Sequence, residues 1–113
     1  MAMLRVSIAK DFSEFPAGRE PEDGPNSGQR FRDEILFPRL KNASSGDVVE
    51  VDLDGTMGYG SSFLEEAFGG LVRNCKFTND FLKQRMHIKD SRVIYGRMVW
   101  NYISEESLRI FGK

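Results

Sequence analysis

Apolar and polar residues alternate along two segments of the chain, which is typical of strands that bury one face. The segments are residues 4–8, with the sequence LRVSI, and residues 49–53, with the sequence VEVDL. This period of two predicts a strand in each segment. The run MHIK, residues 86–89, predicts a third and shorter strand.

Between these strands, apolar residues recur at helical spacing. Ser27 stands where it would cap a helix through residues 28–37, and Pro38 is predicted to kink or end that helix. A second helix is predicted from Ser61 or Ser62, and its inward stripe comprises Leu64, Phe68, Leu71 and Cys75.

Two more helices are predicted in the last third of the chain. One begins at about Thr78. In the other, Ile94, Met98 and Tyr102 form the centre of an amphipathic stripe that is expected to continue through ISEESLRIF. Strands and helices in this order predict a small α/β sandwich, with a mixed or parallel sheet of three to four strands and helices on its faces.

Composition restricts the classes of protein to which the chain belongs. Its 113 residues, 40% of them hydrophobic, suffice for one core, so residues 1–113 are treated as a single domain. A net charge of −1 argues against nucleic acid as a partner. No apolar run approaches the length of a membrane span, no signal peptide precedes the first strand, and the single cysteine forms no internal disulfide. A cytoplasmic protein without membrane contact is expected.

The string DLDGT, residues 52–56, matches the first motif of haloacid-dehalogenase-type phosphatases. In such enzymes, here with Asp52 as the nucleophile and Asp54 moving the proton, a magnesium ion screens the charges. The other groups of that site are missing, because only the separated Asp80 and Asp90 follow among the aspartates. A magnesium-dependent phosphatase is therefore kept only as the alternative function, and an acidic strand end before a turn is the simpler interpretation.

Other reactive side chains give weaker signals. His87 is the only histidine, so a histidine-based metal cage is excluded and a Ser–His triad would need this one residue. Cys75 ends its predicted helix, where the dipole disfavours a thiolate, which suggests a structural thiol. No metal and no cofactor are expected.

A long loop, residues 11–28, holds three of the four prolines. Loops of this length are often functional. Arg19, Arg30 and Arg32, together with the helix start at Ser27, could hold a phosphate or a carboxylate. The alternative is a solvated loop followed by an amphipathic helix.

The stretch SSFLEEAFGG, residues 61–70, follows the second strand through a glycine-rich turn. Ser62 and Glu65 have the spacing of a capping box, in which each side chain bonds the backbone N–H of the other. A strand followed by a polar turn and a helix is also where α/β proteins place anion-binding groups. Both interpretations, a cap and a functional serine, stay open from local chemistry alone.

The run DVVEVDLDGTMGYGSSFLEEAFGGLV and the preceding PAGREPEDGPNSGQRFRDEILFPRL resemble the STAS-like family of domains of unknown function. These domains are related to the sulfate-transporter and anti-sigma-factor-antagonist (STAS) domain. The resemblance extends from about Phe12 to Val72. It implies a STAS-like fold.

In the antagonist family, a partner kinase of the histidine-kinase-like ATPase fold phosphorylates the second serine of an Asp-Ser-Ser-Gly turn. The resemblance places Ser61 and Ser62 at the two serine positions, with Gly60 in place of the aspartate and Phe63 in place of the glycine. An aromatic residue at 63 is expected to restrict the approach of a kinase.

Together these observations predict a non-catalytic regulatory domain that binds a protein partner. Ser62 is the preferred switch residue and Ser61 the second choice. The residues expected to contact a partner or an anion are Arg19, Ser27, Arg30, Gly60, Glu65 and Glu66. A purely structural module without a switch is a further alternative.

Overall fold

Three parallel strands form the sheet around which the chain is organised. The computed structural model of the protein describes residues 2–113. Strands β1 (Met3–Ser7), β2 (Val48–Asp52) and β3 (Met86–Lys89) lie in the order β1-β2-β3, and both neighbouring pairs are parallel. All three predicted strands are confirmed, except that Ile8 begins a short π-helical turn, η1 (Ile8–Phe12), instead of ending β1.

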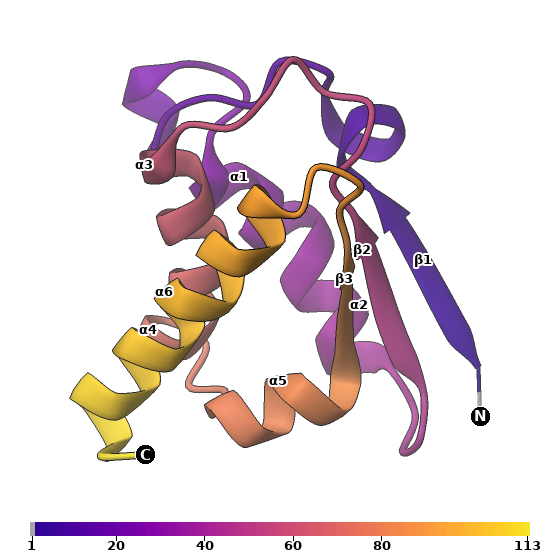
Figure 1. The fold of residues 1–113 in the computed structure, drawn as a ribbon, viewed down its shortest axis with the longest axis vertical. Coiled ribbons are helices and arrows are strands. Elements are labelled where there is room, and N and C mark those ends of the chain that lie inside the picture. The colour runs from indigo at the N-terminus through magenta and orange to yellow at the C-terminus, as the bar shows by residue number, and fades with distance from the viewer. Residues whose placement is uncertain (1) are drawn as a thin grey trace.

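The two faces of the sheet differ in character. Val6, Val49 and Val51 are fully buried on the face toward the helices. On the other face, Arg5 lies 3.4 Å from Glu50 in an ion pair exposed to solvent. Because β1, β2 and β3 follow one another in space as in sequence, right-handed connections bring all the helices to one side (Figure 1). The predicted α/β fold, a parallel sheet flanked by helices, is confirmed.

The connection between β1 and β2 contains a 3₁₀ turn, η2 (Pro21–Asp23), and then one continuous helical segment. That segment comprises α1 (Gly28–Phe31), the π-helical turn η3 (Arg32–Leu36) and α2 (Phe37–Asn42). Pro38 is the second residue of α2, so the alternative that it ends the helical segment is wrong. The wider π-helical turn immediately before it accommodates a residue that has no N–H to donate.

The connection between β2 and β3 contains the second long helical segment. Its parts are α3 (Ser61–Leu64), the π-helical turn η4 (Glu65–Gly69) and α4 (Gly70–Arg73), and α5 (Asn79–Arg85) follows. The last helix is α6 (Ile94–Phe111), which begins near β3 and then runs away from it along the segment 61–73 (Figure 1). None of these helices, within residues 2–113, has the length and apolar character that crossing a bilayer requires.

Aromatic rings from both helical segments meet in the core. Phe31 lies 6.1 Å from Phe63 and 6.4 Å from Phe68, measured between ring centroids, and all three are fully buried. Leu53 and Phe68 belong to the same core, as predicted. In α6 the buried stripe is centred on Val99 and Ile103, one position from the predicted centre, and Ile94 is 60% exposed.

Candidate functional site

The paired serines begin α3 at the end of the loop that leaves β2. Ser61 and Ser62 are both exposed. The residue before the helix is Gly60, and no side chain caps the helix N-terminus. The predicted capping box is wrong because the Glu65 carboxylate accepts hydrogen bonds from arginines instead.

In two other helices of the same chain, a side-chain hydroxyl does cap the N-terminus. The Ser27 hydroxyl accepts a hydrogen bond from the Arg30 N–H at 3.2 Å, and Ser27 is fully buried. Thr78 caps α5 by accepting from the Phe81 N–H at 3.1 Å. Within residues 2–113, by contrast, neither hydroxyl of the serine pair has a hydrogen-bond partner. The pair is thus available to solvent and to other proteins.

The loop between β2 and the serines is held by contacts with Arg92. The Arg92 guanidinium lies over two neighbouring aromatic rings, 5.6 Å from the centroid of Tyr59 and 4.6 Å from that of Tyr95. The Leu53 carbonyl accepts from Arg92 at 2.6 Å and from the Tyr59 hydroxyl at 2.8 Å. Burial raises the pKa of Tyr59 to about 12, so this hydroxyl stays a donor at neutral pH.

The residues that flank the serines leave the surface open. Phe63 is fully buried and packs on Phe31 and Tyr59, with 5.7 Å between the centroids of Phe63 and Tyr59. The expectation that this ring crowds the surface is therefore wrong. A side chain at Gly60 would meet no atom within 4 Å.

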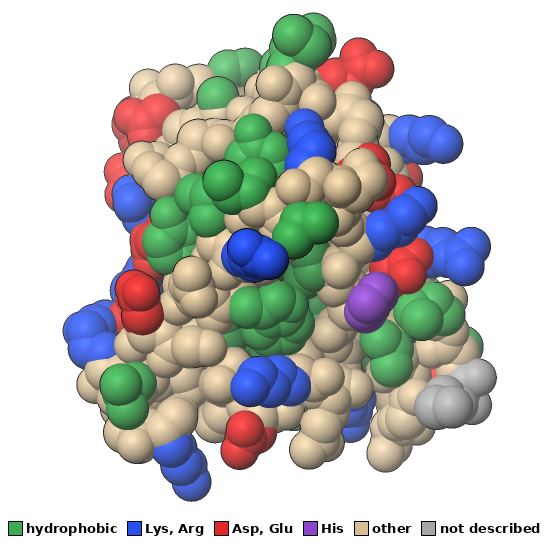
Figure 2. Space-filling model, in the orientation of Figure 1, with side chains coloured by type: hydrophobic (Ala, Val, Ile, Leu, Met, Phe, Trp, Pro, Cys, Tyr) green, Lys and Arg blue, Asp and Glu red, His purple; other side chains and the backbone are tan. Residues whose placement is uncertain are grey.

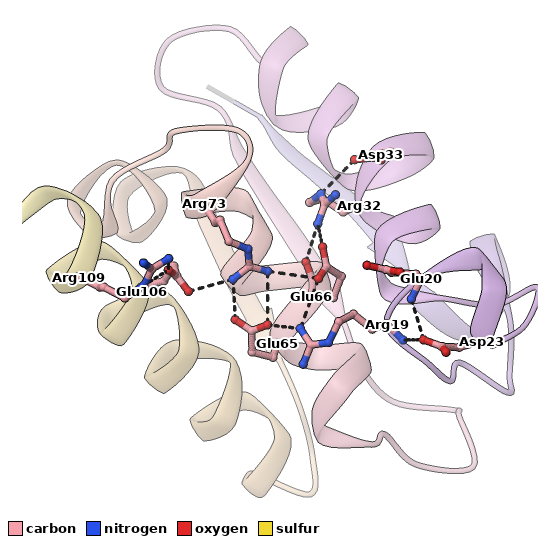
Figure 3. A network of polar contacts seen from close by, with 10 residues as sticks. All are labelled: Arg19, Glu20, Asp23, Arg32, Asp33, Glu65, Glu66, Arg73, Glu106 and Arg109. Atoms are coloured by element: carbon pink, nitrogen blue, oxygen red, sulfur yellow. Dashed lines mark hydrogen bonds and ion pairs between the residues drawn. The ribbon is translucent and has the colours of Figure 1, made fainter.

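The two glutamates that follow lie in a network of ion pairs (Figure 3). Arg19, from the long N-terminal loop, bonds Glu65 and lies 3.3 Å from a Glu66 oxygen. Arg73 lies 2.9 Å from Glu65 and 3.3 Å from Glu66. It also lies 2.9 Å from Glu106 of α6, so the network joins three parts of the chain.

The most buried pair in this network is Arg32 with Glu66. Their side chains are 4% and 11% exposed and their nearest charged atoms are 2.6 Å apart. Arg32 Nη1 also donates to the Glu66 backbone carbonyl at 2.8 Å. Burial would raise the pKa of the neighbouring Glu65, but hydrogen bonds from Arg73 and Arg19 outweigh burial and hold that pKa below its ordinary value.

Two glycines, Gly69 and Gly70, leave room for the side chains of this network. A Cβ atom at Gly70 would lie 2.1 Å from Arg32 Nη1, and one at Gly69 would lie 2.5 Å from a Glu65 carboxylate oxygen. The string EEAFGG is therefore one packing unit, in which two glutamates bind arginines and two glycines make room for them. Arg32 was expected to help hold an anion with Arg19 and Arg30, but its guanidinium is buried and pairs with Glu66 instead.

The predicted anion-binding residues do not share one free cationic site. Arg19 is paired with Glu65 and Glu66. Arg30 lies 3.1 Å from Glu34 and its guanidinium stacks over the Phe12 ring, 5.2 Å from the centroid. The structure brings Arg19, Glu65 and Glu66 together in the ion-pair network, whereas Gly60 stands beside the serines.

A family model described as a STAS-like domain of unknown function (DUF4325) matches residues 27–93. The chain belongs to this family. The match begins at the buried Ser27 cap and continues beyond Val72 through β3, so it includes the serine pair, EEAFGG and the whole sheet except β1. Comparisons with curated proteins and with solved structures gave no significant match.

In this STAS-like domain, both aspartates of DLDGT form hydrogen bonds with neighbouring protein groups. Asp52 accepts from the Asp54 N–H at 2.9 Å and lies 3.6 Å from Lys89 Nζ. Asp54 accepts from the N–H and hydroxyl of Ser91, both at 2.9 Å, and these bonds hold the pKa of Asp54 below its ordinary value. Within residues 2–113 no group of three or more potential protein ligands is placed to hold a metal ion.

The remaining reactive residues lie apart from the serines in the fold. The His87 side chain is 60% exposed, and its Nε2 atom lies 3.9 Å from Glu50 on the open face of the sheet. Cys75 follows α4 and is half-buried, and burial raises the pKa of its thiol. His87 therefore lies in solvent beside a carboxylate, and Cys75 carries a protonated thiol at neutral pH.

Replacing Gly70 with alanine tests the packing unit. Gly70→Ala should lower the free energy of unfolding by about 1–3 kcal/mol, because the new methyl group displaces the buried Arg32 guanidinium. Gly96→Ala is the matched helical control, since its Cβ would make only ordinary contacts, the nearest at 3.6 Å. Urea denaturation of both variants should show loss of stability in the first only. Equal stability of Gly70→Ala and the parent protein would contradict the packing account.

Proposed function

We propose that this STAS-like domain is a non-catalytic regulatory module that binds a protein partner, with Ser62 as the phosphorylation switch and Ser61 as the second choice. One observation carries the proposal: the two serines are exposed at a helix start and neither hydroxyl is used by the fold. In the same chain, Ser27 and Thr78 show hydroxyls that the fold does use. The single cysteine suits a cytoplasmic location.

The charges around Ser62 suit a reversible anion. A phosphate brings about −1.5 to −2 charges, and residues three and four positions along a helix lie on the same side as the modified one. For Ser62 these are Glu65 and Glu66, whose charges are already compensated by Arg19, Arg32 and Arg73. Phosphorylation therefore alters the surface without breaking the fold.

The partner we propose is a kinase of the histidine-kinase-like ATPase fold, by analogy with the related antagonist domains. Three features of the surface support such an encounter. Phe63 points into the core, Gly60 leaves open space, and Arg92 holds the preceding loop in one conformation. A fixed and exposed serine is a substrate that a kinase can reach without unfolding the helix.

A charge introduced at position 62 should change partner affinity and protein stability in different ways. Ser62→Asp should raise the free energy of unfolding by about 0.3–1 kcal/mol, because a carboxylate interacts favourably with a helix N-terminus. Ser62→Ala should change it by less than about 0.5 kcal/mol, since no cap is lost. Affinity for a partner captured from native cells should fall at least about tenfold in the Asp variant, or roughly 1.4 kcal/mol, and stay unchanged in the Ala variant.

Ser45→Asp is the matched control for added charge. Ser45 is exposed in the turn before β2, at the other end of the sheet from Ser62. It should leave partner affinity unchanged. Equal affinity of the Ser62→Asp and Ser62→Ala proteins, both shown to be folded, would remove the switch from this account.

Magnesium binding tests the alternative of a phosphatase. We expect calorimetry to detect no magnesium site in the micromolar to low-millimolar range, because Asp52 and Asp54 supply too few oxygen ligands and are already engaged. Hydrolysis of a generic phosphate ester that disappears in Asp52→Asn would show instead that the domain is an enzyme.

A further inference from the structure

A groove lies between the outer edge of β3 and helix α6, on a different surface from the serine pair. Its volume is about 450 Å³, and Ile88, Val93 and Trp100 supply apolar side chains to its wall. Gly96 also lines the groove, where a Cβ would make an ordinary contact with Ile88 Cγ2 at 3.6 Å. Figure 2 shows hydrophobic side chains on this face of the molecule, with basic side chains beside them.

The backbone of β3 is free on the side of the groove. β3 is an edge strand, because its one partner in the sheet is β2. The Leu53 N–H donates to the Lys89 carbonyl at 2.8 Å, so Lys89 and His87 direct their backbone groups toward β2. Ile88, which alternates with them, directs its N–H and carbonyl outward. An edge of this kind accepts a further strand.

The charge presented in the groove is positive. The Arg97 side chain, which lines the groove, forms no ion pair and no hydrogen bond within residues 2–113. Asp90 also lines the groove, but its side chain is 3% exposed and its carboxylate accepts from the N–H groups of Gly96 and Arg92 at 2.9 and 3.2 Å. The groove therefore offers an unpaired cation beside an apolar wall.

Val93 supports a binding role for the same groove. Its φ angle is +70°, in the left-handed region that a β-branched residue rarely adopts. The side chain is nevertheless 51% exposed at the groove, so burial in the core does not explain the strained conformation. Strained backbone conformations cluster at binding and active sites, which is consistent with a role for Val93 in this groove.

We propose that the groove binds an extended acidic segment of a protein partner, which adds to β3 as a fourth strand. Its backbone would bond the outward groups of Ile88, an apolar side chain would contact Trp100 and Val93, and a carboxylate would pair with Arg97. This interaction goes beyond the serine switch and does not depend on it.

Charge also decides between such a partner and a second copy of the chain. Pairing β3 with β3 of another copy would bring together two copies of Lys89 and two of the unpaired Arg97. Like charges across a strand pair are destabilising, and basic residues on an edge strand are a known means of preventing such association. An acidic segment, by contrast, meets a complementary surface.

A charge-swap selection tests the proposal with defined probes. A random peptide library displayed on phage is selected against the parent protein and against Arg97→Glu. Peptides selected by the parent protein should carry a carboxylate near alternating apolar residues. As synthetic peptides they should bind Arg97→Glu at least tenfold more weakly, and their Asp/Glu-to-Lys versions should show the reverse preference. Lys41→Glu, an exposed change on α2, should bind like the parent.

Two further readouts locate the binding mode. The exchange rate of the Ile88 amide proton should fall at least tenfold when the peptide binds. The Val93→Gly variant should fold normally yet bind the peptide at least tenfold more weakly, because glycine removes both the strain and the apolar contact. Failure to select any peptide, equal binding to Arg97→Glu, or unchanged Ile88 exchange would overturn the proposal. A concentration-dependent dimer that protects Ile88 without peptide would assign the edge to a second copy instead.

Discussion

The buried ion pair between Arg32 and Glu66 is the constraint on which the rest of this fold depends. It joins the helical segment 28–42 to the segment 61–73 at a place where both side chains are nearly excluded from water. A buried charge without its partner is costly, so the two segments must meet in one register. Gly69 and Gly70 provide the space that the arginine needs. Arg73 then extends the network to α6 through Glu106.

This network also explains which charged groups are available for function. Arg19, Glu65 and Glu66 are occupied with one another. Within residues 2–113, the side chains of the paired serines before the network and of Arg97 beside β3 have no such partner. The proposed switch and the proposed groove therefore occupy separate surfaces of one rigid framework, and a phosphate at Ser62 can change binding without disturbing the ion pairs.

Much of the fold could be predicted from the sequence because strands and amphipathic helices have distinct periods. Residues 49–53 alternate strictly, and the structure places them on the central strand and at its end. The predicted helix end at Pro38 is wrong because the segment continues through a π-helical turn, which depends on packing and not on the local sequence. The STAS-like family was recognised from strand, turn, serines and EEAFGG in order.

The candidate site was less accessible from sequence. The spacing of Ser62 and Glu65 suits a capping box, but the same glutamate can reach arginines that are close only in three dimensions. The partner of Glu66 is 34 positions away on another helix, and no local pattern encodes that contact. The groove depends likewise on how α6 crosses the edge of β3, which residue periodicity does not specify.

The central claim is most directly tested by a double-mutant cycle on the buried pair, measured by urea denaturation of Arg32→Met, Glu66→Gln and the double variant. The account predicts that each single change lowers the free energy of unfolding by about 3–5 kcal/mol, because each leaves a buried charged or polar group without its partner. The double variant should lose less than the sum, with a coupling of about 1–3 kcal/mol. Additive losses below about 1 kcal/mol each would contradict it, since exposed pairs behave in that way.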